Sequence, residues 1–180
     1  MDYKFLLEEA GALLKGHFLL TSGLHSDKYI EKMRILENPR LLKPFIDRMR
    51  EIGPDADWIV GPTLGGSIIA FELARVMGKK CAYAERMGEA RKLKRGFDIK
   101  DEDTILIVDD VLTTGGSIKQ TIKAIQKGRI LGGFVMIDRS NQDPEIDIPI
   151  HSVLKYPIRN YTPEDCPLCR KKIPLTRRGG

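Results

Sequence analysis

Residues 105–117, ILIVDDVLTTGGS, join an apolar run to two acids and then to a turn rich in glycine and hydroxyl side chains. The apolar run lacks polar alternation, which predicts a strand buried on both faces. Glycines let a backbone approach a ligand closely, and a helix starting near Ser117 offers free N–H groups and a positive dipole end to an anion. The turn therefore predicts a phosphate site made by Thr113, Thr114, Gly115, Gly116 and Ser117.

The two acids, Asp109 and Asp110, need a partner other than the phosphate. Ionised carboxylates accept hydrogens from a sugar diol, bind Mg²⁺, or stabilise positive charge that develops at carbon. A ribose 5-phosphate suits the whole stretch, with its phosphate in the turn and its diol on the acids. The stretch lacks the Gly-Lys-Ser/Thr ending of a Walker loop, and no G-x-G-x-x-G opens a helix in this chain.

Strand and helix patterns alternate around this stretch. Apolar runs predict strands at residues 57–60, 80–85, 104–110, 132–139 and 151–158, with helices at about 67–77 and from 117 to 128. This alternation predicts a doubly wound α/β fold with a mostly parallel sheet of about five strands. Nearer the N-terminus, helical spacing predicts a helix over residues 2–15 stopped by Gly16, and Asn38-Pro39 predicts the start of another that reaches about Glu51.

Composition is that of an ordinary globular protein, and 180 residues fit a single domain over residues 1–180. No apolar run approaches the roughly 20 residues of a membrane helix, and the N-terminus lacks the apolar core of a signal peptide, so a cytoplasmic location is expected. The net charge of +5 suits a polyphosphate substrate as well as nucleic acid. The basic segment 170–180 is interpreted as a solvated surface.

Cys166 and Cys169 have the spacing of half a zinc site, but the sequence holds no second cysteine pair. A site shared across a dimer and a redox pair both stay open as interpretations. The three histidines, His17, His25 and His151, are scattered along the sequence and do not have metal-ligand spacing.

The stretch at 105–117 resembles the phosphoribosyl pyrophosphate (PRPP) signature of the type I phosphoribosyltransferases. Five further segments resemble the orotate phosphoribosyltransferases: GHFLLTSGLHSDKYIEK (16–32), GPTLGGSIIAFELA (61–74), LKRGF (93–97), MIDR (136–139) and CPLCRKKIPL (166–175). The resemblance covers nearly the whole chain in the family's order. It implies the type I phosphoribosyltransferase fold, with an N-terminal helix and hood over residues 1–38, a mobile basic loop over 86–103 and a C-terminal tail over 159–180.

The resemblance also implies an activity. The phosphoribosyl group of PRPP passes to orotate in pyrimidine (UMP) biosynthesis, giving orotidine 5′-monophosphate and pyrophosphate. Mg²⁺ is the implied cofactor; it enters with PRPP and has no direct protein ligand. The implied assembly is a homodimer in which the loop of one subunit closes over the site of its neighbour. Nucleic acid and membranes are not implied partners.

Roles for individual residues follow from the same resemblance. Asp109 and Asp110 contact the ribose and its oxocarbenium-like transition state, and residues 113–117 hold the 5′-phosphate. Orotate is bound by Arg139, Thr113, Ser22 and Gly23, with Lys28 and Tyr29 nearby, while Thr63, Leu64 and Gly65 form the pyrophosphate loop. The mobile loop contributes Arg86, Arg95 and a catalytic lysine that is either Lys92 or Lys94.

The sequence departs from the family pattern at several places, one of which is the mobile loop, where it lacks the histidine of the Lys-x-His element that some members have. Leu64-Gly65 stands where many members have Tyr-Lys, Thr21 stands where some have lysine, and Gly116 replaces a usual threonine. Two alternatives stay open. A purine phosphoribosyltransferase would keep residues 109–117 but change the hood and Arg139, and a non-catalytic PRPP sensor could bind nucleic acid. The second alternative lacks a recognisable helix-turn-helix or aromatic-basic RNA motif.

Overall fold

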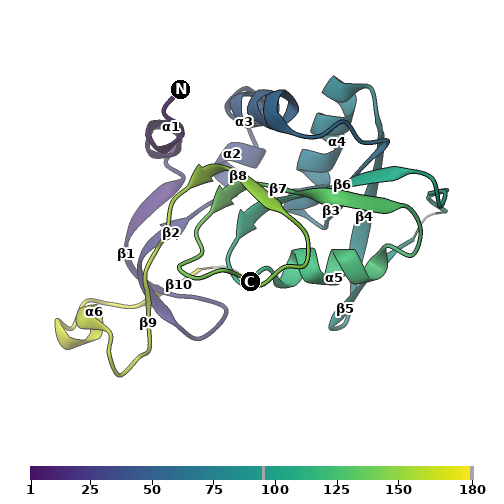
Figure 1. Cartoon of the computed structure of the whole chain (residues 1–180). Coiled ribbons are helices and arrows are strands. Elements are labelled where there is room, and N and C mark those ends of the chain that lie inside the picture. Colours follow the sequence, from purple (N-terminus) through teal and green to yellow (C-terminus); the bar gives the residue numbers. More distant parts are fainter. Residues whose placement is uncertain (95, 179–180) are drawn as a thin grey trace.

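The computed structural model describes residues 1–94 and 96–178. Its central sheet has six strands in the order β5-β4-β3-β6-β7-β8 (Figure 1). Five of them are parallel, as predicted: β3 (Trp58–Pro62), β4 (Lys80–Met87), β6 (Thr104–Leu112), β7 (Arg129–Asp138) and β8 (Ile150–Lys155). The sixth, β5 (Ala90–Leu93), pairs antiparallel with β4 at the edge and forms a hairpin from the first half of the predicted basic loop.

Helices cover both faces of this sheet, which confirms the doubly wound prediction. Figure 1 shows α3 (Pro39–Ile52) and α4 (Gly65–Met77) above the sheet, with the short α2 (Met33–Leu36) beside them, and α5 (Gly116–Ala124) below it. Asn38 caps α3 by accepting a hydrogen bond from the N–H of Arg40 at 3.1 Å, so this helix starts where the sequence predicts.

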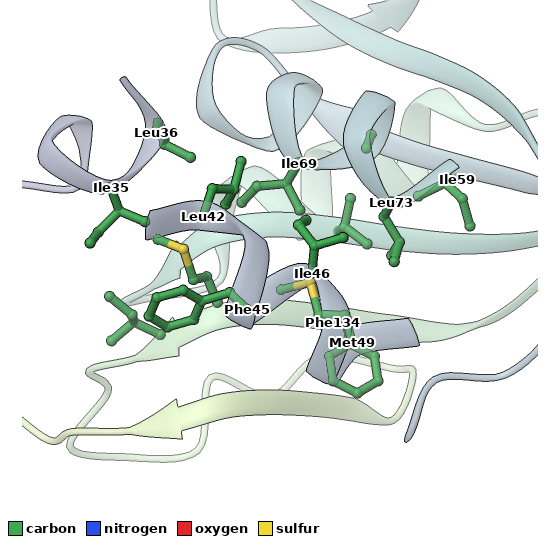
Figure 2. Packing of buried hydrophobic residues seen from close by; sticks show 14 of the residues in the cluster. Ile35, Leu36, Leu42, Phe45, Ile46, Met49, Ile59, Ile69, Leu73 and Phe134 are labelled. Atoms are coloured by element: carbon green, nitrogen blue, oxygen red, sulfur yellow. The ribbon is translucent and has the colours of Figure 1, made fainter. Parts of the chain in front are cut away.

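Alternate residues of the buried strands supply two separate cores. On the face of α3 and α4, Phe45, Met49 and Leu73 pack with Phe134 of β7 (Figure 2). On the opposite face, Ile118 of α5 packs with residues such as Ile107. Each fully buried side chain of this size contributes about 1.5–3 kcal/mol relative to exposure, so both helical layers are held firmly on the sheet.

The N-terminal segment differs from its prediction. Helix α1 covers only Tyr3–Glu9, and Leu13–Leu19 form strand β1, so the predicted helix over residues 2–15 is wrong after its first two turns. Strand β1 pairs antiparallel with β2 (His25–Ile30), with Leu13 opposite Ile30 and Leu14 opposite Tyr29. The two leucines fit helical spacing, but the strand partner that overrides this local preference lies further along the chain.

A second sheet, which we call the hood sheet, joins this N-terminal hairpin to the C-terminal tail. Its order is β10-β1-β2-β9, where β9 is Asn160–Tyr161 and β10 is Thr176–Arg177. The short helix α6 (Pro167–Arg170) lies between these two strands and beside the hairpin (Figure 1). The hood sheet brings His17 and His25 together with Cys166 and Cys169, so these histidines are scattered only in sequence. Within residues 1–94 and 96–178, no helix is long and apolar enough to span a membrane.

Candidate active site

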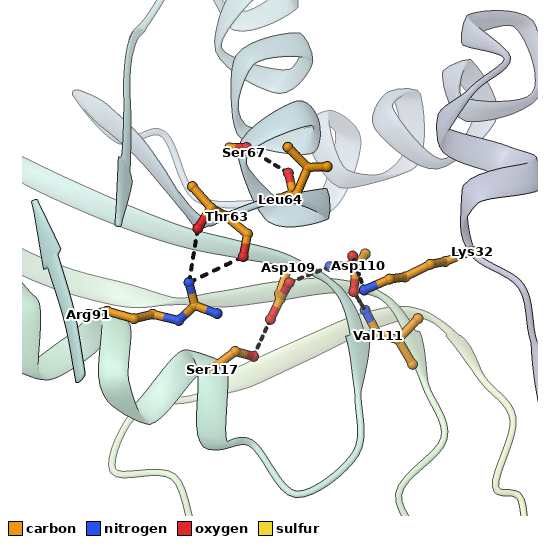
Figure 3. Close-up of polar contacts among 9 residues, drawn as sticks. All are labelled: Lys32, Thr63, Leu64, Ser67, Arg91, Asp109, Asp110, Val111 and Ser117. Atoms are coloured by element: carbon orange, nitrogen blue, oxygen red, sulfur yellow. Dashed lines mark hydrogen bonds and ion pairs between the residues drawn. The ribbon is translucent and has the colours of Figure 1, made fainter. Parts of the chain in front are cut away.

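The acid pair lies buried near the carboxyl end of β6. Asp109 accepts hydrogen bonds from the Ser117 hydroxyl and from the N–H of Asp110, the latter at 2.8 Å. Asp110 accepts one from the N–H of Val111 at 2.6 Å and forms an ion pair with Lys32, whose Nζ lies 2.7 Å from Oδ2 (Figure 3). The two residues are only 5% and 4% exposed, and these partners hold both carboxylates in place.

Electrostatics at the pair make Asp109 harder to ionise than an exposed aspartate. Burial and the neighbouring Asp110 charge raise the pKa of Asp109 to about 7, although the hydrogen bonds from Ser117 and Asp110 oppose this shift. A carboxyl group that resists ionisation is well suited to a positively charged partner. Cationic charge arriving next to Asp109 would restore its ionised form.

Close packing against helix α4 explains the glycines of the predicted pyrophosphate loop. A Cβ atom on Gly65 would lie 1.7 Å from Oδ2 of Asp110, and a Cβ atom on Gly66 would lie 3.0 Å from Oδ1 of Asp109. Both carboxylates therefore touch the N-terminus of α4, where the helix dipole favours negative charge. The loop and the acid pair form one unit.

The predicted phosphate turn follows β6 directly. Gly115 has a left-handed backbone, with φ of 74°, and is the N-cap of α5. A Cβ atom there would also lie 2.7 Å from the Ile146 side chain, so glycine is required for two reasons. Thr113 and Thr114 border a cavity of about 420 Å³ next to this turn. The Ser117 hydroxyl is directed to Asp109, which links the turn to the acids.

A second cavity, which we call the hood pocket, lies between the phosphate turn and the hood sheet. It has a volume of about 450 Å³ and is bordered by Thr21, Ser22, Tyr29, Thr113, Thr114 and Arg139, together with Asn160 and Arg178 of the tail. Ser22, Thr113 and Arg139 are thus brought together. Gly23 lies in the same β1–β2 turn, with φ of 81°, but does not border the pocket.

Arg139 is the buried cation of the hood pocket. It follows β7, is 7% exposed, and donates a hydrogen bond from Nη2 to Oδ1 of Asn160 at 3.0 Å. Burial lowers the pKa of Arg139, but a guanidinium stays protonated in proteins. Its charge is therefore available to an anionic group in the pocket.

The predicted pyrophosphate loop contacts the hairpin β4–β5. The Thr63–Leu64 peptide bond is cis, and Leu64 is exposed. Arg91 of β5 donates from Nη1 to the carbonyl oxygen of Thr63 at 3.2 Å (Figure 3) and to that of Ala84 at 3.1 Å. Its Nε is buried without a hydrogen-bond partner among the described residues.

The predicted cations of the basic loop lie away from the acids. Arg86 donates from Nε to the Gly88 carbonyl at 3.1 Å, and Lys92 and Lys94 are exposed. Lys92 borders a hollow together with Lys123 and Lys127. Among the residues described, these loop cations contact neither acid of their own chain. Arg95 lies outside the described residues.

Four residues of the site have no predicted role: Lys32, Arg91, Asn160 and Arg178. Lys32 ends the segment 16–32 that resembles the family, so its position was a usable signal. Arg91 and Asn160 reach the site through pairing with β4 and β2, which the chain's local pattern does not reveal. Arg178 belongs to the basic tail interpreted as solvated surface, yet it borders the hood pocket.

Comparison with known proteins shows which family the chain resembles over most of its length. A model of the phosphoribosyl transferase domain matches residues 34–167. An orotate phosphoribosyltransferase of Thermoanaerobacter sp. (strain X514) is 39% identical over 178 residues, covering 97% of this chain and 94% of the relative. The enzyme of that name from Thermotoga maritima is 36% identical over 189 residues, covering 98% and 96%.

Solved structures agree with these relatives. The orotate phosphoribosyltransferase of Aeropyrum pernix superposes with a TM-score of 0.74 at 25% identity, covering 86% of this chain and 93% of that one. An adenine phosphoribosyltransferase of Thermoanaerobacter pseudethanolicus has a TM-score of 0.63 at 18% identity, covering 72% and 88%, and shares the fold alone. The chain has the acid pair and the phosphate turn, and the relatives that match it over nearly the full length are orotate phosphoribosyltransferases. It therefore belongs to the type I phosphoribosyltransferase family, among its orotate phosphoribosyltransferases.

Proposed function

We propose that this protein transfers the phosphoribosyl group of PRPP to orotate, giving orotidine 5′-monophosphate and pyrophosphate. The observation that carries the proposal is the continuity of the site. Thr113 and Thr114 border both the hood pocket with Arg139 and the cavity at the phosphate turn, and β6 presents the acids just before them. One substrate can therefore occupy the hood while a sugar phosphate spans the turn and the acids.

Each part of the site has a place in this reaction. Orotate is an anion, and its carboxylate suits the buried guanidinium of Arg139, a group that can make paired hydrogen bonds to a carboxylate. Residues 113–117 supply donors for the 5′-phosphate, with Ser22 and the adjoining Gly23 turn closing the hood over the base. In this proposal Thr63, Leu64 and Gly65 face the leaving pyrophosphate.

The acid pair stabilises the transition state. As the bond from C1′ to pyrophosphate lengthens, positive charge develops on the ribose, and fixed carboxylates nearby lower the energy of that state. Asp109 and Asp110 are held in place by Ser117, Lys32 and backbone N–H groups before substrate arrives. Positioning and electrostatics then carry the reaction without a covalent intermediate.

Mg²⁺ fits this site as a partner of PRPP. Next to the loop proposed for the leaving group, the Thr63 hydroxyl and the two carboxylates offer hard oxygen atoms, which suit the waters around a Mg²⁺ ion that is bound to PRPP. When bound to pyrophosphate, Mg²⁺ neutralises charge and makes the group easier to displace. Arg91, whose Nη1 donates to the Thr63 carbonyl, would hold the loop that faces this group.

We further propose a homodimer in which Lys92 or Lys94 of one subunit, with Arg86, reaches the pyrophosphate in the other. A mostly apolar surface supports a second copy as the partner. Phe71 of α4 is 64% exposed and borders a hollow together with Leu36 and Tyr83. Leu64 is 67% exposed, and its carbonyl oxygen accepts a hydrogen bond from Ser67, which also borders that hollow. Leu64 belongs to the pyrophosphate loop, so this surface is continuous with the site.

The direct test is turnover. The purified protein is mixed with PRPP, Mg²⁺ and orotate, and the loss of orotate absorbance is followed; uracil, adenine, hypoxanthine and xanthine are run in parallel with detection of pyrophosphate. We expect turnover with orotate alone. Turnover with a purine instead would overturn the assignment of the hood pocket, and PRPP binding without turnover on any base would reject the enzymatic proposal.

A further inference from the structure

Four metal-binding side chains meet at the outer end of the hood sheet. They are His17 on β1, His25 at the start of β2, Cys166 at the N-cap of α6 and Cys169 within α6. Their ligand atoms all lie within 4.8 Å of one another. His17, His25 and Cys166 are buried, at 3%, 5% and 0% exposure. None of the four borders the hood pocket or touches the acid pair.

The individual distances come close to those around a tetrahedral ion. Nε2 of His17 lies 3.0 Å from Nδ1 of His25 and 3.4 Å from Sγ of Cys166, and Nδ1 of His25 lies 3.3 Å from Sγ of Cys169. A tetrahedral zinc ion with ordinary Zn–N and Zn–S bonds separates its ligand atoms by about 3.3–3.8 Å. Small adjustments of the side chains therefore suffice for all four to bind one ion.

A second contact fixes the tautomer of His17 that can bind a metal ion. Its Nδ1 lies 2.8 Å from the carbonyl oxygen of Ile173, which can only accept a hydrogen bond. Nδ1 therefore carries the proton in the neutral ring, and Nε2 presents its lone pair to the other three groups. A backbone carbonyl that orients a histidine in this way is a regular feature of protein zinc sites.

We propose that this Cys₂His₂ cluster binds one structural zinc ion. Four protein ligands leave no open position for a substrate or water, which distinguishes a structural from a catalytic zinc site. The ion would join the β1–β2 hairpin to the tail around α6, segments about 140 residues apart in the sequence. It would thereby hold the tail that carries Asn160 and Arg178 to the hood pocket. An isolated hydrogen-bonded cluster and a redox-active Cys166–Cys169 pair are the competing interpretations.

Metal content is the first measurement. The untagged full-length chain is purified under reducing conditions, dialysed with zinc and then against buffer, and its zinc is measured by mass spectrometry. We expect about one zinc ion per chain. Replacing zinc with Co²⁺ should give the intense visible bands and sulfur-to-cobalt charge transfer of tetrahedral thiolate coordination. Less than about a tenth of an ion per reduced chain, or no such spectrum, would overturn the proposal.

Single substitutions test whether the four side chains of the cluster bind the ion. Cys169→Ser and His25→Ala should each lose most of the bound metal, whereas Cys81→Ser, a thiol of β4 outside the cluster, should keep it. If the cluster variants fail to fold, the wild-type chain still decides the question, because a chelator should lower its melting temperature by about 5–10 °C. Full metal content in Cys169→Ser, or a melting temperature indifferent to chelation, would reject the site.

Discussion

A single missing atom at Gly65 determines how close the acid pair comes to helix α4. Because a Cβ atom there would lie 1.7 Å from Oδ2 of Asp110, alanine must displace that carboxylate from Lys32 and from the Val111 N–H. The backbone itself accepts alanine, since Gly65 begins a helix and alanine stabilises helices by about 0.5–1 kcal/mol relative to glycine. A substitution at this position is therefore expected to lower activity without lowering the stability of the fold.

The Gly65→Ala variant is predicted to lose about 100-fold in kcat/KM while its melting temperature stays within a few degrees of wild type. Steady-state kinetics and thermal unfolding measure the two effects. Asp110→Asn serves as the matched variant and should show a loss of similar size. Wild-type turnover in Gly65→Ala would mean that the position of Asp110 does not matter.

Asp109 makes stability depend on pH in an identifiable direction. Its pKa is raised on folding, mainly by burial and then by Asp110, so the ionised form is penalised in the folded state. Near pH 4 and below, the group is protonated in the folded state and the penalty is small. As pH rises from about 4 to about 7, the penalty grows to at most about 4 kcal/mol and then stays constant.

The Asp109→Asn variant removes this titration. We predict that it is more stable than wild type at pH 8, by about 1–4 kcal/mol, and that the difference shrinks near pH 4. Turnover should be lost at every pH. Urea unfolding at several pH values measures the difference directly, and two stability curves that run parallel across this range would contradict the prediction.

At the scale of secondary structure, the edge hairpin β4–β5 supports the pyrophosphate loop through Arg91. The guanidinium bridges the carbonyl oxygens of Thr63 and Ala84, and burial lowers its pKa. Both contacts are made by Nη1, so lysine could keep them only with its single charged nitrogen and would lose the planar guanidinium that packs between the hairpin and the loop. The hairpin therefore contributes to the site through one arginine of the same chain.

We predict that Arg91→Lys raises KM for PRPP by about 10-fold or more and leaves KM for orotate within about twofold, because Arg91 lies on the pyrophosphate side. Initial rates with each substrate varied in turn give both constants. Arg129→Lys, at the exposed start of β7, is the control and should match wild type. Equal increases in both constants would show that the hairpin acts on the whole site.

Strands and helices whose residue pattern is set by their own segment could be predicted from the sequence, whereas strands that depend on pairing with a distant segment could not. Strands β3 and β6 contain the uninterrupted apolar runs 58–60 and 105–108, which are followed by Gly61 and by Asp109, so their place in the parallel sheet follows from pattern alone. Strand β1 was mispredicted because Leu13 and Leu14 fit a helix until β2 and β10 pair with that segment. Strand β5 was missed because Arg91 and Lys92 interrupt its apolar pattern, and pairing with β4 compensates.

Across the whole molecule, the site is assembled from segments far apart in sequence, and this limited what could be predicted. The acids and the phosphate turn are contiguous, so residues 109–117 could be recognised together. The hood pocket needs the tail to return to β1 and β2, and therefore Asn160 and Arg178 carried no local signal. The same return brings Cys166 and Cys169 to two histidines that precede them by more than 140 positions.

In the proposed homodimer, the acids and the loop lysines of one complete site come from two different chains. The double variant Asp109→Asn with Asp110→Asn should be inactive but keep its loop cations, and Lys92→Ala with Lys94→Ala should be inactive but keep its acids. If the loop of one subunit serves the site of the other, a heterodimer of the two variants contains one complete site.

Co-expression with two different affinity tags isolates that heterodimer, and we predict about half of the wild-type activity per dimer. Each variant homodimer purified alone is the control and should stay inactive. The recovery is possible only if loop and acids come from different chains, since within either single chain one of the two is always disabled. A stable heterodimer without activity would therefore assign Lys92 and Lys94 to the site of their own subunit, whereas a chain that stays monomeric would reject the apolar surface around Phe71 as an interface.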